Sequence, residues 1–447
     1  RVVGSPNLAN VRTIMIGVRN PKQENNPRDD DGLQKSGEVW INELRLTDFK
    51  EDGGWAANSR VNAKMADFAD ITVAGSTSKP GFGSIEKKVN ERQKEEINQL
   101  DVSSNIHLDK FFPERFGVRL PMYVGYSRAV SNPQFNPLEP DVEFDKSLEV
   151  APTDAFRDSI RNIAQDFKER KSINFTNVRV TNPTGADKRP EPSFYSPANF
   201  SLSYAYNEIY ARNINTQFDI TKKYTGSIAY NFNNNPKNVK PFSGVSAFNS
   251  PLFRIIKDFN FFYAPRQISV STDMNRTYRE TQLRNISNPE LQIDPTFQKD
   301  FQWRRNYDIK YNLTQALKLN FSATARARID EPDGRISRNA PGFESKRDTI
   351  FQRILDGGRL TNYQHRLNAS WRLPINKLPL LGWTSTNLKY TGKYTWRVGP
   401  RTDTDIELGN IISNNQNIQL NGQLNFNRLY NRVGFLKRIN QELSRQG

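Results

Sequence analysis

The 447-residue sequence contains no cysteine and only two histidines and four methionines. The absence of cysteine excludes a disulfide framework, a thiol nucleophile and cysteine-ligated zinc or iron–sulfur sites. The mean hydropathy is −0.75, and no apolar run approaches the ~18 residues that a membrane helix requires. These features exclude a helical membrane protein.

Aromatic and basic residues are abundant. The sequence has 28 Phe, 16 Tyr and 6 Trp, too many for a chain that remains disordered and solvated. Its 64 Lys and Arg exceed its 48 Asp and Glu, so that the net charge is +16 and nucleic acid, anionic lipid or lipopolysaccharide are plausible partners. Arg1 and the residues after it lack the basic and apolar regions of a signal peptide, so we expect a mature chain, a trimmed chain or a fragment.

The dominant pattern is period two, which is typical of β-strands. Phe200, Leu202, Tyr204 and Tyr206 alternate with small polar or apolar residues. The same alternation recurs in segments 116–126, 214–220, 224–232, 268–274, 303–313, 317–325, 367–373, 388–398 and 418–426. Many of these runs approach the ~10 residues that cross a bilayer as a tilted strand, and several are about twice the length of strands in soluble sandwiches. The sequence predicts an all-β fold, an antiparallel transmembrane β-barrel segment.

In each predicted strand, the residues at alternate positions differ in chemistry: one set is mostly apolar and the other mostly polar. This indicates one face in contact with lipid and one in contact with water. We expect the apolar parity to face lipid, and its members are Val118, Leu120, Val124, Ile309, Tyr311, Leu319, Phe321, Tyr390 and Leu420. We expect the excess positive charge on the lumen face and at the rims, at Arg326, Arg328, Arg372, Lys389 and Lys393.

The predicted connections fall into two classes, as in outer-membrane barrels, where one rim has short turns and the other long loops. Short connections are predicted at 66–69, 110–115, 314–315 and 374–382, and long polar loops at 77–102, 128–197, 277–302, 329–362 and 398–415. Helical spacing within 85–100 and 156–167 predicts that two of these loops carry short helices. Residues 1–50 differ in pattern and are interpreted as the end of a water-exposed β domain, with the barrel in 51–447.

Segment 234–266 is predicted to be the one long connection on the short-turn side, a periplasmic excursion. Short barrel turns are usually periplasmic. On this basis the strand 116–126 runs outward, 200–206 inward, 214–220 outward and 224–232 inward. An extra strand at 172–181 would reverse these directions. Phe253, Ile256, Lys257 and Phe259 predict a short amphipathic helix in the excursion, a candidate contact for a periplasmic partner.

No catalytic or cofactor-binding pattern emerges. His107 falls between Ile106 and Leu108 on the polar face of a strand, and His365 shares its side of a strand with Leu367 near a loop rim, so both are interpreted as structural. The acidic run 29–32 lacks the ligand spacing of a calcium loop. Gly81-Phe82-Gly83 completes no phosphate-binding motif. We therefore expect no enzyme, no metal and no cofactor. Basic residues beside aromatic ones, as at 303–305 and 394–397, resemble a stacking platform for nucleic acid. Their spread over nearly every strand favours an aromatic girdle instead, and we expect no nucleic-acid partner.

Residues 37–49, 53–57 and 60–64 carry a family resemblance, through Trp40, Asn42, Glu43, Leu44, Arg45, Gly53, Gly54 and Trp55. The block resembles the SprA/Sov family of Bacteroidetes, and the likeness continues at 256–260 and 274–276. The resemblance implies a late portion of the very large outer-membrane barrel of the type IX secretion system, a translocon for folded proteins tied to gliding motility. It further implies as partners the rest of the same barrel polypeptide, secreted cargo, a PorV-like barrel and a plug protein, together with outer-membrane lipid and lipopolysaccharide.

Two other classes of protein remain open from the residues alone. A self-contained porin or receptor barrel would pair the first and last strands of this chain with one another. A soluble basic β protein that binds nucleic acid would stay in solution without detergent.

Overall fold

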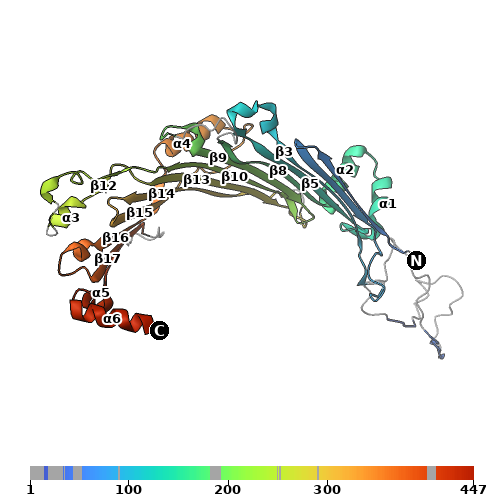
Figure 1. Ribbon diagram of the computed structural model, residues 1–447. Helices are drawn as coiled ribbons and strands as arrows, with labels where there is room; N and C mark the ends of the chain where they lie inside the picture. The colour runs from blue at the N-terminus through green and yellow to red at the C-terminus, as the bar shows by residue number, and fades with distance from the viewer. Residues whose placement is uncertain are drawn as a thin grey trace.

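The protein forms one large antiparallel sheet that curves into an open arch, as Figure 1 shows for the computed structural model. The structure describes residues 15–18, 34, 36–43, 53–88, 91–181, 193–248, 250, 253–288, 291–399 and 409–446. The arch begins with β1 and ends with β18, and the order of strands in the sheet follows the order in the chain.

Each long strand pairs with the next long strand in the sequence. The sheet contains β1 (Ala56–Met65), β2 (Ala69–Ser78), β3 (Glu95–His107), β4 (Val118–Arg119), β5 (Pro121–Pro133), β8 (Asp166–Val180), β9 (Phe200–Arg212), β10 (Thr216–Asn233), β13 (Gln267–Leu283), β14 (Thr296–Asn312), β15 (Leu317–Arg328), β16 (Arg359–Leu373), β17 (Thr384–Arg397) and β18 (Ile411–Leu424). Two small sheets pair β6 (Phe135–Asn136) with β7 (Glu139–Glu143) and β11 (Asn238–Val239) with β12 (Phe261–Phe262).

The helices are short and lie in the connections or after the last strand. They are α1 (Phe144–Glu149), α2 (Asp154–Ala164), α3 (Arg254–Lys257), α4 (Phe343–Leu355), α5 (Phe426–Tyr430) and α6 (Gly434–Gln446). Single 3₁₀ turns are η4 (Leu108–Phe111), η5 (Glu114–Phe116), η6 (Pro197–Asn199), η7 (Ser246–Phe248) and η9 (Pro374–Lys377). Among the described residues, no helix has the length and apolar character needed to cross a membrane.

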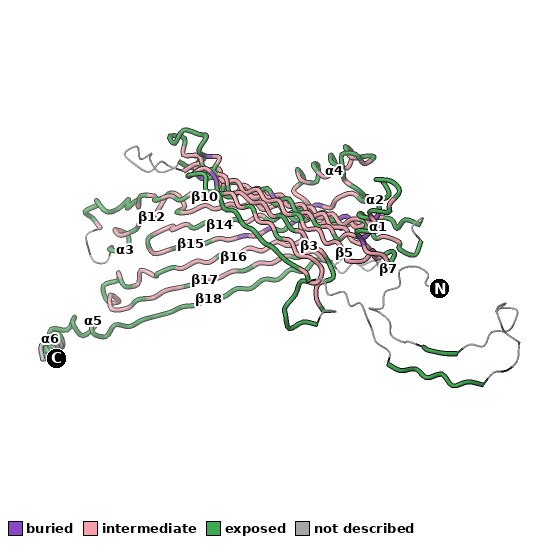
Figure 2. The backbone as a smooth tube through the Cα atoms, turned by 90° about the vertical axis from the view of Figure 1, so that its right-hand side faces the viewer, coloured by how far each residue is buried: buried purple, intermediate pink, exposed green. Residues whose placement is uncertain are grey.

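The sheet is a single layer and encloses no ordinary hydrophobic core. Only ten hydrophobic residues in the described part of the chain are buried, and most of the backbone in Figure 2 is exposed or intermediate. A local cluster of Phe144, Ile160 and Ala164 packs α1 against α2. Since soluble domains bury an apolar face against a second layer, this sheet needs other surroundings for its apolar side chains.

The two outermost strands leave the arch open. In the described part of the chain, β1 pairs only with β2, β18 pairs only with β17, and the two edges are not joined. The antiparallel β architecture is therefore as predicted, but the structure shows no closed barrel. Pairing of the first and last strands, which the self-contained porin requires, is not observed among these residues.

The connections divide between two rims. The short-turn rim, as we call it, carries 66–68, 108–120, 181–199, 234–266, 313–316 and 374–383, and the opposite long-loop rim carries 79–94, 134–165, 213–215, 284–295, 329–358 and 398–410. The four predicted short connections lie together on one rim. In contrast, 213–215 is a tight turn on the long-loop rim, where Asn213 accepts hydrogen bonds from the backbone of Asn215 and Thr216.

All five predicted long loops include residues that the structure places in strands. Strands extend into both ends of 277–302, and β16 and β18 begin inside 329–362 and 398–415. The helix predicted within 85–100 is wrong, because Ile97 and Leu100 lie in β3, where cross-strand pairing with β2 and β5 prevails over local spacing. The helix predicted within 156–167 is observed as α2, which Thr153 caps by accepting a hydrogen bond from the Phe156 amide.

Three predicted strands also differ. Loop 128–197 contains β8, which corresponds to the alternative strand at 172–181 but begins earlier, at Asp166, where the charged residues 168–171 obscure the alternation. Segments 214–220 and 224–232 are one strand, β10, and the strand predicted over 116–126 is interrupted between β4 and β5.

These errors affect the predicted strand directions. Because β8 intervenes, β9 runs in the direction opposite to that predicted for 200–206. Because 214–232 is one strand, the second error cancels the first, and 234–266 lies on the short-turn rim as predicted. The prediction that it is the one long connection there is wrong, since the connection from β8 to β9 joins strand ends on the same rim.

Candidate functional site: the two faces of the arched sheet

The strand register assigns every side chain in the sheet to one of two faces, because directly opposed residues in antiparallel strands point to the same side. Ile309 opposes Ile268 and Phe321, and Phe321 opposes Leu367. Followed across the sheet, this register places eight of the nine predicted lipid-facing residues on one face: Val118, Val124, Ile309, Tyr311, Leu319, Phe321, Tyr390 and Leu420. The ninth, Leu120, lies between β4 and β5. Their contact with lipid stays a prediction.

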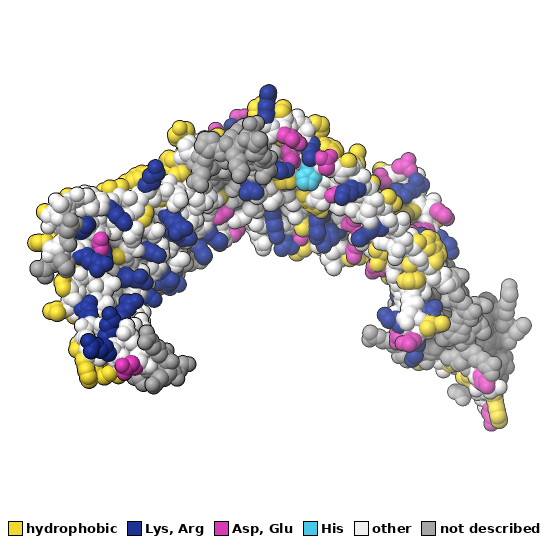
Figure 3. All heavy atoms as spheres, in the orientation of Figure 1, with side chains coloured by type: hydrophobic (Ala, Val, Ile, Leu, Met, Phe, Trp, Pro, Cys, Tyr) yellow, Lys and Arg dark blue, Asp and Glu magenta, His cyan; other side chains and the backbone are white. Residues whose placement is uncertain are grey.

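The face shared by these residues is the outer, convex face of the arch. Hydrophobic side chains follow the convex outline in Figure 3, whereas Lys and Arg gather toward the concave side. Helix α4 lies over the convex side in Figure 1, and its connection contacts Arg276 and Glu280, which share the apolar parity. The five cations predicted on the lumen side, Arg326, Arg328, Arg372, Lys389 and Lys393, all lie on the opposite, concave face.

The convex face is apolar only next to the short-turn rim. On β9, Phe200, Leu202, Tyr204 and Tyr206 are followed by Glu208 on the same face. Across the neighbouring strands the half beside the long-loop rim carries charged residues, including Lys171, Lys222, Arg276, Glu280 and Lys299. The aromatic rings of Tyr206 and Tyr224, with centroids 4.9 Å apart, lie at the boundary. An apolar band bordered by aromatic residues is typical of an outer-membrane barrel wall.

The charged half of the convex face is covered by connection 329–358. Arg276 donates to Glu331 in a bidentate pair, with Nη2 2.7 Å from Oε2, and the Glu331 side chain is only 1% exposed. Arg335 binds Glu280, and Lys299 donates to the carbonyls of Pro332 and Gly334. Beneath the connection, small side chains on β15 let it approach closely, and Ala323, Ala325, Ala327 and Ile329 are buried. These contacts hold the connection against the wall.

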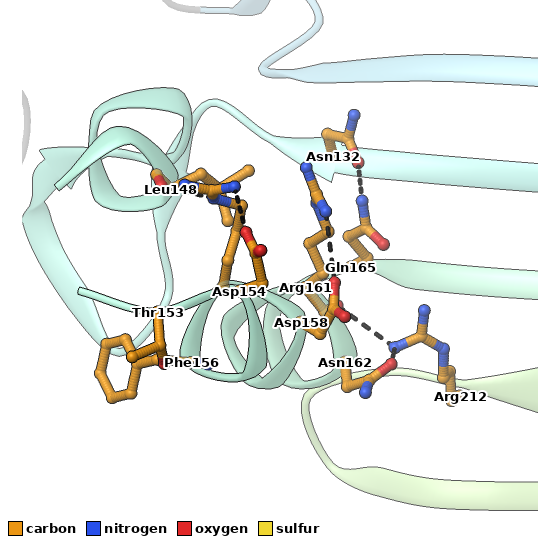
Figure 4. A network of polar contacts seen from close by, with 11 residues as sticks. Asn132, Leu148, Thr153, Asp154, Phe156, Asp158, Arg161, Asn162, Gln165 and Arg212 are labelled. Carbon is orange, nitrogen blue, oxygen red and sulfur yellow. Dashed lines mark hydrogen bonds and ion pairs between the residues drawn. The ribbon is translucent and has the colours of Figure 1, made fainter. Parts of the chain in front are cut away.

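Connection 134–165 forms a second structured cap on the long-loop rim (Figure 4). Gln165 donates to Asn132 at 2.7 Å, Arg157 donates to the Leu148 carbonyl at 3.1 Å, and Arg212 at the end of β9 donates to Asn162. Helix α2 is thereby tied both to α1 and to the strand ends.

Excursion 234–266 is anchored to neighbouring turns on the short-turn rim. The Gln315 amide donates to Asn260 at 2.9 Å, Tyr311 donates to the Phe262 carbonyl at 2.8 Å, and Lys377 pairs with Asp258 at 3.0 Å. The predicted amphipathic helix is the single turn α3. Of the four predicted contact residues, Phe253, Ile256 and Phe259 are 42–48% exposed and Lys257 belongs to the same turn. Phe253 and Phe259 belong to an aromatic cluster with Phe242 and Phe248.

Two turns of the short-turn rim are joined by an ion pair between Asp67 and Lys110. The hydrogen bond and charge of Lys110 lower the pKa of Asp67 below its ordinary value, and Asp67 in turn raises the pKa of Lys110. Both groups therefore remain charged across the neutral range.

Neither histidine forms a catalytic arrangement with the groups that the structure places around it. His365 lies on the convex face, stacked on Tyr394 with ring centroids 5.1 Å apart. His107 Nδ1 is 3.8 Å from Asp109 Oδ1 at the end of β3. The described residues include no group of three or more His, Asp and Glu side chains suited to hold a metal ion. The absence of enzymatic activity stays a prediction.

The family-signature residues are described only in part. Leu44 and Arg45 lie outside the described residues, as does most of segment 1–50, whose assignment to a separate β domain stays a prediction. The indole of Trp40 is 88% exposed and donates to Glu38 at 3.2 Å, and Asn42 and Glu43 are also exposed. Gly53 and Gly54 precede Trp55, whose carbonyl accepts from the Lys79 amide. A Cβ at Gly54 would clash with the backbone of Phe82, so only glycine fits there.

The fold and its two faces define an open, arched antiparallel sheet with an apolar band on its convex face and cations on its concave face. Residues 1–148 match the SprA_N family, described as a motility related/secretion protein. The resemblance to the SprA/Sov type is therefore confirmed over residues 1–148. No curated protein matches the chain.

Proposed function

We propose that this chain is part of the wall of an outer-membrane channel that passes folded proteins to the cell surface by type IX secretion. The observation that carries the proposal is the single-layer arch, with the apolar band on its convex face, here called the apolar belt, its polar concave face and its two open edges. Convex curvature turns the apolar belt outward toward lipid. The family match to a motility related/secretion protein supports passage of proteins as the task.

The open edges support the rest of the same polypeptide as the first partner. An unpaired strand edge exposes a row of backbone donors and acceptors, and such a row is costly in hydrocarbon. Further strands paired to β1 and β18 satisfy these groups, and a larger strand number gives a wider lumen. We propose that secreted cargo passes through the lumen and that lipid and lipopolysaccharide contact the convex face. The PorV-like barrel and the plug protein are proposed from the family alone.

Export of a folded reporter cargo tests the function. In cells that lack the chain, the reporter should accumulate folded in the periplasm, and the native chain supplied from a plasmid should restore its appearance at the surface. A porin or receptor barrel predicts unchanged export and altered uptake of a small hydrophilic solute instead. Extraction of the intact chain by salt alone, without detergent, would contradict membrane insertion and favour the soluble alternative.

Thiol labelling tests which side the short-turn rim occupies, and the absence of native cysteine makes the label specific. We propose that this rim is periplasmic, as short barrel turns usually are. Lys237→Cys, at an exposed site of the excursion beside Asn238, should react with a membrane-impermeant maleimide only after the outer membrane is opened. Ser337→Cys, exposed on the long-loop rim, is the matched control and should react in intact cells. The reverse pattern would refute the proposed orientation.

A further inference from the structure

Positive charge on the concave face is concentrated in three adjacent strands near one end of the arch. Strands β15, β16 and β17 contain nine Lys and Arg and no Asp or Glu. The register places all nine on the concave face, and we call them the cationic strip: Lys318, Arg326, Arg328, Arg359, Arg366, Arg372, Lys389, Lys393 and Arg397. The convex positions of the same strands carry no Lys or Arg.

Most of the cationic strip is exposed and lacks counter-ions. Every member except Arg359 is exposed, and Arg359 is paired with Asp330 at 2.8 Å. Arg328 lies 3.9 Å from Asp300 and from Asp330. The other seven make no ion pair with any residue that the structure describes. Their charge is available to an external anion.

Several cations of the strip directly oppose other cations. Arg366 opposes Lys393 and Arg326 opposes Arg304 of β14, whereas the opposed Arg328 and Arg359 share Asp330 as a counter-ion. Like charges at directly opposed positions destabilise a sheet, so this arrangement reduces the stability of this part of the sheet. A shallow cavity of about 190 Å³, lined in part by Arg366, Lys393 and Gln364, lies within the strip. An anionic partner would relieve the repulsion.

The remainder of the concave face is close to balanced. From β1 to β13 it carries eight cations and six acids: Arg60, Lys64, Arg119, Lys168, Arg170, Arg179, Lys223 and Arg279, with Asp70, Glu95, Asp101, Asp166, Asp219 and Asp273. Some of these neutralise each other, as Arg279 and Asp219 do at 2.6 Å. Strand β18 carries no charge at all. The strip is therefore a local feature, distinct from the general basic character of the chain.

We propose that the cationic strip binds acidic segments of protein that pass along the concave face. This inference rests on the proposed function and names the chemistry of its substrate. The partner is protein because the membrane lies on the opposite, apolar face of the same strands, and one lipid surface does not contact both. Exposed charges attract an oppositely charged chain over about a Debye length, ~8 Å at physiological ionic strength, while each contact remains weak and exchangeable. Such contacts suit a segment in transit.

Peptide binding to the intact protein purified in detergent tests the proposal. A fluorescent 20-residue polyglutamate peptide should bind, and raising the salt concentration should weaken its binding. A Gly-Ser peptide of the same length should not bind. In the double variant Arg366→Glu with Lys393→Glu, polyglutamate binding should weaken at least about tenfold, because two attractions become repulsions. The double variant Arg366→Gln with Lys393→Gln removes both charges and perturbs the fold less. Its affinity for polyglutamate should lie between that of the double glutamate variant and that of the native chain.

Matched controls separate the strip from general charge. Lys223→Glu alters an exposed concave lysine outside the strip, and Arg128→Glu alters an exposed convex arginine. Neither should change binding more than about twofold. Equal weakening in the controls and in the double variant would overturn the inference, as would the absence of peptide binding. Lipopolysaccharide micelles that bind more tightly than the peptide and depend on Arg366 and Lys393 would assign the strip to lipid instead.

The failure of this inference is distinguishable from that of the proposed function. If cells without the chain lose reporter export but the purified protein binds no peptide, the channel function is supported and the cationic strip is rejected as a protein-binding surface. Unchanged export together with strip-dependent peptide binding would retain the surface and reject the channel.

Discussion

Phe321→Arg is expected to destabilise the folded protein by about 2–4 kcal/mol, whereas Asn320→Arg should cost far less. Phe321 lies on the convex face between Ile309 and Leu367, within the apolar belt, and its neighbour Asn320 points to the concave face. A guanidinium placed in hydrocarbon loses its hydration, while one placed on the concave side remains in water. Urea unfolding of the membrane-inserted protein measures the difference.

A second pair of substitutions repeats this comparison at the edge of the sheet. Leu420 lies on the convex face of β18 and Gln419 on the concave face. Leu420→Arg should therefore cost more than Gln419→Arg, by an amount that shrinks if position 420 lies near the membrane interface. Equal costs for the two parities at both sites would contradict the assignment of the convex face to lipid.

Glu331→Ala is expected to release connection 329–358 from the wall, at a local cost of about 3–5 kcal/mol. Glu331 is almost fully buried, and its removal leaves the Arg276 guanidinium without its bidentate partner on a face where only part of its surface reaches water. Because the loss is local, it should appear as faster proteolysis within 329–358 and as faster amide exchange there.

A control in the same connection tests whether burial causes the effect. Asp348 pairs with Arg347 on α4, with both side chains more than half exposed. Asp348→Ala should cost less than ~1 kcal/mol and leave the proteolysis rate nearly unchanged, because exposed ion pairs contribute little. If both variants were cleaved at the native rate, Glu331 would not hold the connection in place.

The ion pair between Arg276 and Glu331 could not be predicted from the sequence, for a physical reason. Arg276 and Glu331 are 55 residues apart, and the family resemblance at 274–276 does not indicate a partner for Arg276. The only available signal was the departure of Arg276, Glu280 and Lys299 from the apolar parity of their strands. Charged side chains at nominally lipid-facing positions indicate either that the strand has left the hydrocarbon or that a loop covers it, and the structure shows the second arrangement.

Which residues share a face could be predicted from the sequence, because side-chain parity is a local property of an extended chain. Ile309 and Phe321 needed only alternation within their own strands to be assigned together, and so did Lys389 and Lys393 on the other face. Turns with few alternatives, such as 314–315, were found for the same reason. The N-terminal signature likewise pointed to the family that residues 1–148 match.

Which strands pair, where they end and whether the sheet closes were decided only by the tertiary structure. Segment 166–180 has the local character of a charged loop, yet it forms β8 because β5 and β9 supply hydrogen-bonding edges on both sides. Pairing energy of this kind depends on residues far away in the sequence. The lumen side of Arg326, Arg328, Arg372, Lys389 and Lys393 followed from the sequence, but only the strand register shows that β15, β16 and β17 lie side by side and bring these cations together with Lys318, Arg366 and Arg397.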